Sequence, residues 1–274
     1  MTLAQHGFSS ATTPIPVRWS PPRARADAPR VEFIDVAFTA SGTMSVIEAI
    51  EERPADAPFA YVVTPNVDHI VRLQHQRSDL WPAYRAAWMT LCDSRILARL
   101  ARRVGFALPV VPGSDLTRQM FEQVVQPQDR IAILGGRSEL IAQLSERYGL
   151  RNVRHYNPPM GFIHDPVEVT KAVRFLVDSG ARYHFLAVGS PQQEILAYRV
   201  GRAGRATGVG LCVGASLDFL TGVQERAPLV MQRLGLEWLF RLGANPRRMW
   251  KRYLVDGPLI FPIEQRWRRD HAKP

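Results

Sequence analysis

Asp93 is the first candidate for chemistry in the sequence, because it closes an apolar stretch at residues 88–93. A carboxylate at the end of a buried strand is well placed to act as a general base that takes a proton from an attacking hydroxyl group. The same side chain could instead cap the helix predicted for residues 95–104, since Asp is a favoured N-cap residue. Spacing alone favours the cap.

Polar or small residues also follow the other apolar stretches of the chain. The main ones are Thr64, Asn66, Gly136, Asn157, Ser190, Gln193, Glu194 and Ser216. Taken singly, each is typical of a turn that leads into a helix. In a parallel sheet, however, the carboxyl ends of the strands meet at one edge, where ligands bind. Together these residues predict a cleft lined by small residues, amides and an acid.

One of these turns, Gly135-Gly136-Arg137-Ser138, has the composition of a phosphate-binding loop between a strand and a helix. It is only half of a dinucleotide fingerprint, and Gly208, Gly210 and Gly214 lack the G-x-G-x-x-G spacing. The sequence contains neither a G-x-x-x-x-G-K-[ST] loop nor a D-x-D pair that would hold a metal against a diphosphate. A diphosphate would therefore be bound by Arg, Lys or backbone N–H groups, and we expect no metal and no cofactor.

Seven apolar stretches supply the strands that would position these residues. They cover residues 31–39, 59–66, 88–93, 130–136, 152–157, 183–190 and 208–220. Helical patterns separate them, at residues 67–78, 95–104, 116–125, 138–148, 167–178 and 192–200. Short apolar strands that alternate with helices predict an α/β fold: a Rossmann-like, mainly parallel sheet with helices on both faces.

The two ends of the chain have a different composition from this core. Residues 1–30 are rich in Pro, Ala and Arg without hydrophobic periodicity, and predict a flexible leader before a core at 31–225. Residues 226–274 predict a helical appendage, with helices at 229–244 and 247–255. Its cations are Arg226, Arg233, Arg241, Arg247, Arg248, Lys251 and Arg252.

The net charge of +10 favours a polyanionic partner, which could be nucleic acid, an acidic membrane surface or a phosphate-rich substrate. No apolar run approaches the roughly 20 residues that span a bilayer, so a membrane would be met on one face. The appendage places Trp250, Tyr253 and Leu254 among its arginines, which suits an anionic membrane interface. A solvated charged face over an ordinary core stripe explains the pattern about equally well.

Cys92 and Cys212 lie in apolar runs and are interpreted as buried thiols.

Several short motifs occur in one order along the chain. They are Thr64-Pro65-Asn66, Asp93, Pro112-Gly113-Ser114-Asp115-Leu116, Gly189-Ser190-Pro191-Gln192-Gln193-Glu194, Val213-Gly214-Ala215-Ser216-Leu217-Asp218-Phe219, Arg226-Ala227-Pro228, Gly235-Leu236-Glu237-Trp238-Leu239-Phe240-Arg241 and the run from Asn245 to Leu254. With them the chain resembles the WecG/TagA/CpsF glycosyltransferases (glycosyltransferase family 26) from about residue 30 to about residue 255. One departure from the family pattern is Ser94, because many members have Gly directly after the catalytic Asp.

The resemblance implies an inverting, metal-independent transfer from a UDP-sugar to a sugar on undecaprenyl diphosphate, in cell-surface polysaccharide biosynthesis. It implies that Asp93 is the general base rather than a cap, that Thr64 belongs with the catalytic residues, and that Thr64 and Asn66 line the pocket. Gln193 would contact a sugar, and the substrate-binding set is completed by Gly136, Glu194 and Arg226. Arg241, Arg248 and Arg252 would come from an appendage that closes over the site, touches the membrane and stabilises the UDP leaving group.

The resemblance also implies a cytoplasmic enzyme at the inner face of the cell membrane. Family members can self-associate through the face that the appendage would cover, so a homo-oligomer is a further expectation. Two other functional classes are open to a basic α/β chain. A Rossmann-like oxidoreductase or methyltransferase would need a complete glycine fingerprint. A basic nucleic-acid-binding protein would need a recognised binding motif, and we find none.

Overall fold

The computed structural model describes residues 29–222, 227–234 and 236–271. The leader predicted for residues 1–30 lies almost wholly outside the described residues, as does Arg226. Within the described ranges, no helix is long and apolar enough to cross a membrane.

The core is a six-stranded sheet in the order β4-β3-β8-β7-β5-β6, in which every pairing is parallel. Its strands are β3 (Ala60–Val63), β4 (Met89–Thr90), β5 (Arg130–Leu134), β6 (Asn152–Tyr156), β7 (Tyr183–Leu186) and β8 (Val209–Cys212). Every residue of β3, β7 and β8 is buried, as expected for central strands covered on both faces. The predicted parallel α/β sheet is confirmed.

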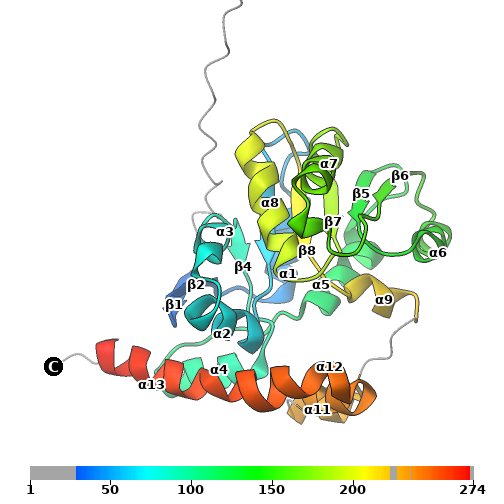
Figure 1. The fold of residues 1–274 in the computed structure, drawn as a ribbon. Coiled ribbons are helices and arrows are strands. Elements are labelled where there is room, and N and C mark those ends of the chain that lie inside the picture. The colour runs from blue at the N-terminus through cyan, green and yellow to red at the C-terminus, as the bar shows by residue number, and fades with distance from the viewer. Residues whose placement is uncertain (1–28, 223–226, 235, 272–274) are drawn as a thin grey trace, which may run out of the picture.

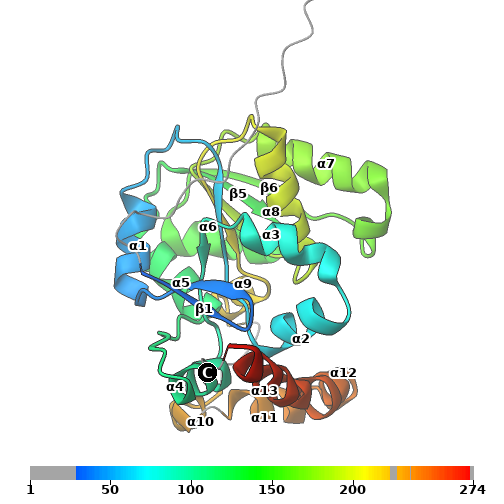
Figure 2. The same cartoon turned by 90° about the vertical axis from the view of Figure 1, so that its left-hand side faces the viewer.

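Alternate residues along each strand enter two hydrophobic clusters, one on each face of the sheet. Val62 and Ile133 pack with α1 (Thr43–Glu51), α5 (Gly113–Gln119), α6 (Ser138–Tyr148) and α9 (Ser216–Leu220). Tyr61 and Leu134 pack with α2 (Val67–His75), α3 (Trp81–Arg85), α4 (Arg95–Arg103), α7 (Pro166–Val177) and α8 (Gln192–Ala203). Figure 2 shows α1 and α5 on one side and α2, α3, α7 and α8 on the other. The Rossmann-like prediction is therefore confirmed.

The predicted strands are longer than the observed ones, and two of them also differ in arrangement. Residues 31–39 form a separate antiparallel hairpin of β1 (Arg30–Phe33) and β2 (Val36–Thr39). The chain reverses at Ile34 and Asp35, both at positive φ, as in the tight turns that suit hairpins. The stretch predicted as a strand over 208–220 leaves the sheet after Cys212. It turns at Gly214, where φ is +53°, and continues as α9.

The C-terminal part is helical, as predicted, and extends further than expected. It contains α10 (Leu229–Leu234), α11 (Glu237–Ala244), α12 (Pro246–Trp250), a π-helical turn η4 (Lys251–Asp256), a 3₁₀ turn η5 (Gly257–Leu259) and α13 (Ile260–His271). Figure 1 shows α12 and α13 as one nearly continuous rod along the bottom of the molecule. The helix α13 was not predicted.

The far end of this rod packs into the core. Ile260, Ile263 and Trp267 belong to the same cluster as Tyr61 and the other residues on that face of the sheet, and the Trp267 ring lies 5.3 Å from the Phe33 ring. Hydrophobic packing of α13 therefore anchors the appendage to the core. The division of the chain into a catalytic core and an appendage between residues 225 and 226 stays a prediction.

Candidate active site

The loops after β5 and β7 leave the sheet in opposite directions, since β5 leads to β6 on one side and β7 to β8 on the other. Such a switch point opens a crevice at the carboxyl ends of the strands. The two loops lie very close: a Cβ on Gly135 would be 2.8 Å from the Ala187 carbonyl oxygen, and Gly135 has a φ of +93°. Only glycine fits there. Gly136 also adopts a positive φ, and its carbonyl oxygen accepts from His155 Nε2 at 3.1 Å.

Asp93 follows β4 at this same edge, and it does not cap the next helix. That role belongs to Ser94, whose hydroxyl accepts a hydrogen bond from the Leu97 amide at 3.2 Å. The Asp93 backbone N–H donates to the Pro65 carbonyl at 3.0 Å, which ties the ends of β4 and β3 together. The cap favoured by spacing alone is therefore wrong, and the Asp93 carboxylate is not needed to begin α4.

The Asp93 side chain is half-buried and lies among four other charged groups. Burial raises the pKa of Asp93 to about 7. The positive charges of Arg241 and Arg252 act against this rise in pKa, and the negative charges of Glu237 and Asp115 add to it. A carboxylate with a pKa near the working pH has the basicity that suits a general base.

Thr64 and Asn66 end β3 and begin α2. Thr64 is buried, and a Cβ on Gly113 would lie 3.0 Å from its hydroxyl oxygen, so the start of α5 packs directly on it. Asn66 caps α2: its Oδ1 accepts from the Asp68 backbone N–H at 3.1 Å, and the Asn66 backbone N–H donates to His69 Nδ1 at 3.3 Å. Both residues follow β3 at the carboxyl edge of the sheet, and their predicted role in lining the pocket stays a prediction.

Gln193 and Glu194 begin α8 and are buried. Gln193 Oε1 accepts from the Gly214 amide at 2.8 Å, and its Nε2 donates to Glu194 Oε1 at 2.9 Å. Gln193 therefore joins the loops after β7 and β8. Burial raises the pKa of Glu194, while Gln193, Ser190 and Arg72 oppose that rise. Glu194 has no exposed surface, and its predicted contact with substrate stays a prediction.

The appendage brings two of the predicted arginines to Asp93. Arg241 forms an ion pair with Glu237 one helical turn away, at 2.6 Å, and its guanidinium lies over the Phe219 ring of α9 at 5.7 Å. Arg252 lies 3.6 Å from the carboxylate of Asp68 in α2. Both are therefore held by the core as well as by their own helices.

The remaining predicted arginines cannot be placed in this way. The backbone of Arg248 lies in α12, but its side chain is outside the described part of the structure. Arg226 lies outside the described residues altogether. Their roles stay predictions.

Residues 31–273 match the glycosyl transferase WecG/TagA/CpsF family. The chain belongs to this family. The match extends through α13, beyond the residues that carry the motif resemblance. The chain is therefore a glycosyltransferase of cell-surface polysaccharide biosynthesis, with a nucleotide-sugar donor and a lipid-linked acceptor. This membership decides against the oxidoreductase, methyltransferase and nucleic-acid-binding alternatives.

Four charged residues of this WecG/TagA/CpsF chain were not assigned to the site from the sequence. Asp115 and Glu237 act on Asp93, and Asp68 and Arg72 form an ion pair beside Arg252. The ion pair between Asp68 and Arg72 could have been predicted, because oppositely charged residues four apart lie side by side on a helix. Nothing in the sequence indicated that Arg252 would join them.

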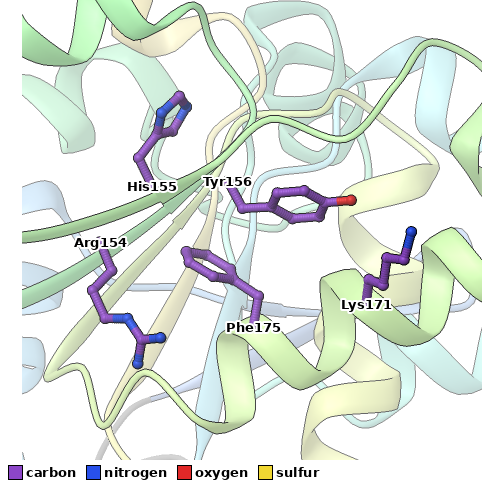
Figure 3. Close-up of a pocket in the computed structure, with 5 residues that line it drawn as sticks. All are labelled: Arg154, His155, Tyr156, Lys171 and Phe175. Atoms are coloured by element: carbon purple, nitrogen blue, oxygen red, sulfur yellow. The ribbon is translucent and has the colours of Figure 1, made fainter.

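Two cavities lie away from Asp93. One of 440 Å³ lies between β6 and α7, and Figure 3 shows the residues that line it: Arg154, His155, Tyr156, Lys171 and Phe175. Its polar groups already have partners, since Tyr156 donates to Glu168 at 2.7 Å and Arg154 to the Asp178 carbonyl at 2.7 Å. The other, of 390 Å³, lies beside the β1–β2 hairpin. Neither touches Asp93, so volume alone does not identify the active site of this family member.

Among the described residues, no three His, Cys, Asp or Glu side chains are grouped so that they could hold a metal ion. The cations beside Asp93 that the structure does place are the guanidinium groups of Arg241 and Arg252. Guanidinium groups bind phosphate oxygens through paired N–H donors, so they can meet the charge of a diphosphate directly.

Proposed function

We propose that this chain is an inverting glycosyltransferase that moves a sugar from a UDP-sugar to a sugar on undecaprenyl diphosphate without a metal ion. The observation that carries the proposal is Asp93, a carboxylate with a pKa of about 7 on which the charges of two arginines of the appendage act. Membership of the family supports the reaction class.

In the proposed reaction the acceptor hydroxyl oxygen attacks the anomeric carbon from the face opposite UDP. As the new carbon–oxygen bond forms, the bond from that carbon to the UDP oxygen breaks, and the hydroxyl proton passes to the Asp93 carboxylate. Attack and departure on opposite faces invert the anomeric centre. The electron pair leaves with UDP, where Arg241 and Arg252 stabilise the growing negative charge of the β-phosphate. Each guanidinium has five donors, so Arg241 can bind phosphate while it remains paired with Glu237.

The site residues from the core have supporting roles in this scheme. Gly136 stands at the crevice between the β5 and β7 loops, where the backbone and the start of α6 suit a phosphate. Thr64, Asn66 and Gln193 shape the pocket edge, and Arg248 would add a third cation. Glu194 supports Gln193 from the interior.

We also propose that the enzyme docks on the inner face of the cell membrane through its appendage. Several large apolar side chains there are about half exposed: Leu239, Trp250, Leu254, Val255 and Phe261. Arg247 and Lys251 are exposed in the same segment. Apolar side chains interleaved with cations suit an anionic lipid surface, and the lipid-linked acceptor would be met there.

The proposal is tested by a screen of UDP-sugars against an undecaprenyl-diphosphate-linked acceptor, with UDP release as the readout. We expect release from one or a few donors only when the acceptor is present, and an inverted anomeric configuration in the product. Release that needs no acceptor, or a product of retained configuration, would contradict the mechanism.

A further inference from the structure

Asp68, in the first turn of α2, contacts an arginine from each of two different parts of the molecule. Its Oδ2 forms an ion pair with Arg72, one turn further along the same helix, and lies 3.6 Å from Arg252 of the appendage. The three side chains are only 17%, 18% and 31% exposed, respectively. Because these charges are partly removed from water, their interaction is screened less than that of an ordinary surface pair.

Arg72 carries the connection onward to the loop after β7. Its guanidinium donates to the Ser190 hydroxyl at 2.9 Å, and Ser190 lies just before α8 and Gln193. Arg252 of the appendage, Asp68 and Arg72 of α2, and Ser190 of the β7 loop therefore form one continuous chain of polar contacts. It runs from the appendage to the loop that borders the crevice at the carboxyl edge of the sheet.

The surroundings of Arg252 make the Asp68 carboxylate important to its position. Arg252 Nε is buried, and within the described part of the chain it has no hydrogen-bond partner. The neighbouring His69 leaves this balance of charge unchanged. Burial, with help from Arg72 and Arg252, holds the pKa of His69 well below its usual range, so its ring stays neutral. Asp68 is thus the countercharge between two guanidinium groups that would otherwise repel each other.

We propose that Asp68 is a positioning residue that seats Arg252 beside Asp93 and couples docking of the appendage to the order of the Ser190 loop. Its effect on turnover rests on the function proposed above, whereas the contact itself does not. Asp68 need not touch substrate, because it acts through Arg252 and Arg72.

The first experiment compares Asp68→Asn with wild type in the full-length chain, using UDP release. We expect kcat to fall about tenfold with the donor KM changed less, because Arg252 acts on charge that develops in the transition state. Asp68→Glu keeps the charge and can still reach both arginines, so it should recover most of the activity. The matched control is Asp79→Asn, which removes the exposed Arg77–Asp79 pair next to α2 and should leave kcat unchanged.

The second experiment separates the positioning role from a loss of general stability. In a double-mutant cycle with Arg252→Gln, the Asp68→Asn variant should add little further loss, because both changes remove the same contact. Multiplicative effects, or a failure of Asp68→Glu to recover activity, would overturn the proposal.

A third measurement needs no activity at all. Backbone amide hydrogen exchange over Lys251–Asp256 should be faster in Asp68→Asn than in wild type and in Asp79→Asn. If wild type releases no UDP but exchange still rises, the proposed function fails and the positioning contact stands. If exchange in this segment is unchanged in Asp68→Asn, the contact does not seat the appendage and the inference is wrong.

Discussion

Arg241 in α11 lies close enough to Asp93, after β4, that its positive charge stabilises the Asp93 carboxylate. Burial favours the neutral acid, and Arg241 is the strongest of the neighbouring charges that oppose this. The appendage therefore affects the base as well as the leaving group. Release of the appendage would remove both of these cations, Arg241 and Arg252, from the diphosphate site.

The first prediction concerns pH. The base works as the carboxylate, so kcat/KM should rise with pH through about 7, the pKa of Asp93. In Arg241→Gln a stabilising positive charge is lost, so the pKa should increase and the rising limb should move to higher pH. The maximal rate should also fall by about 10–100-fold, because a donor to the leaving group is missing. The control is Arg269→Gln, at an exposed position in α13, which should leave the rise of kcat/KM with pH unchanged.

The second prediction is a loss of activity combined with a gain in stability. Asp93→Asn should reduce transfer by about 10²–10⁴-fold, the usual contribution of a general base. The folded-state pKa of Asp93 is raised, so its ionisation destabilises the fold as pH rises from about 4 to about 7. Asn cannot ionise. Urea unfolding should therefore show Asp93→Asn more stable than wild type at pH 8, with the difference vanishing near pH 4. The rise in pKa from about 4 to about 7 sets an upper limit of about 4 kcal/mol, and solvent screening of this half-buried carboxylate should reduce the difference below that limit.

Either half of that prediction can fail on its own. Full turnover in Asp93→Asn would show that another group takes the proton. Equal stability at pH 8 would show that Asp93 is better hydrated than its neighbours indicate.

The sequence predicted the parts of this site that depend on local pattern. Strands such as β5 and β7 are short apolar runs bounded by turn residues, and Asp93 was found because it ends such a run. The hairpin was missed because the positive φ of Ile34 is not typical of a β-branched residue. Helix α13 was missed because its apolar positions, Ile260, Ile263 and Trp267, lie among many arginines.

The charges around Asp93 could not be predicted in the same way. Glu237 and Arg252 come from the far end of the chain, and only the tertiary fold places them beside β4. The surroundings of Glu194 could not be predicted from its motif either, since its side chain is fully buried and accepts a hydrogen bond from Gln193.

The third prediction tests the cap of α4, which also concerns the departure from the common glycine after the catalytic Asp. Ser94→Ala removes the acceptor for the Leu97 amide and should lower the free energy of unfolding by about 1 kcal/mol. Ser94→Gly should cost only a few tenths of that, since glycine is itself a tolerated N-cap. Turnover should stay within about twofold in both, because Asp93 does not depend on the Ser94 side chain. Equal stability of Ser94→Ala and wild type would show that another residue caps the helix.

The last prediction concerns the membrane. Trp250 and Leu254 are each more than half exposed in the segment that carries Arg252. Trp250→Ser with Leu254→Ser should weaken binding to vesicles that contain anionic lipid by more than about tenfold, since each large apolar side chain contributes about 1.5–3 kcal/mol when buried. Met160→Ser, at a fully exposed apolar site near α7, is the matched control and should bind as wild type does. Sedimentation with the vesicles measures this binding.

Release of UDP with a short, water-soluble acceptor should change little in the double variant, because neither side chain is proposed to touch the reacting groups. Unchanged vesicle binding would place the membrane contact elsewhere, whereas loss of activity on the soluble acceptor would place these side chains in the active site itself.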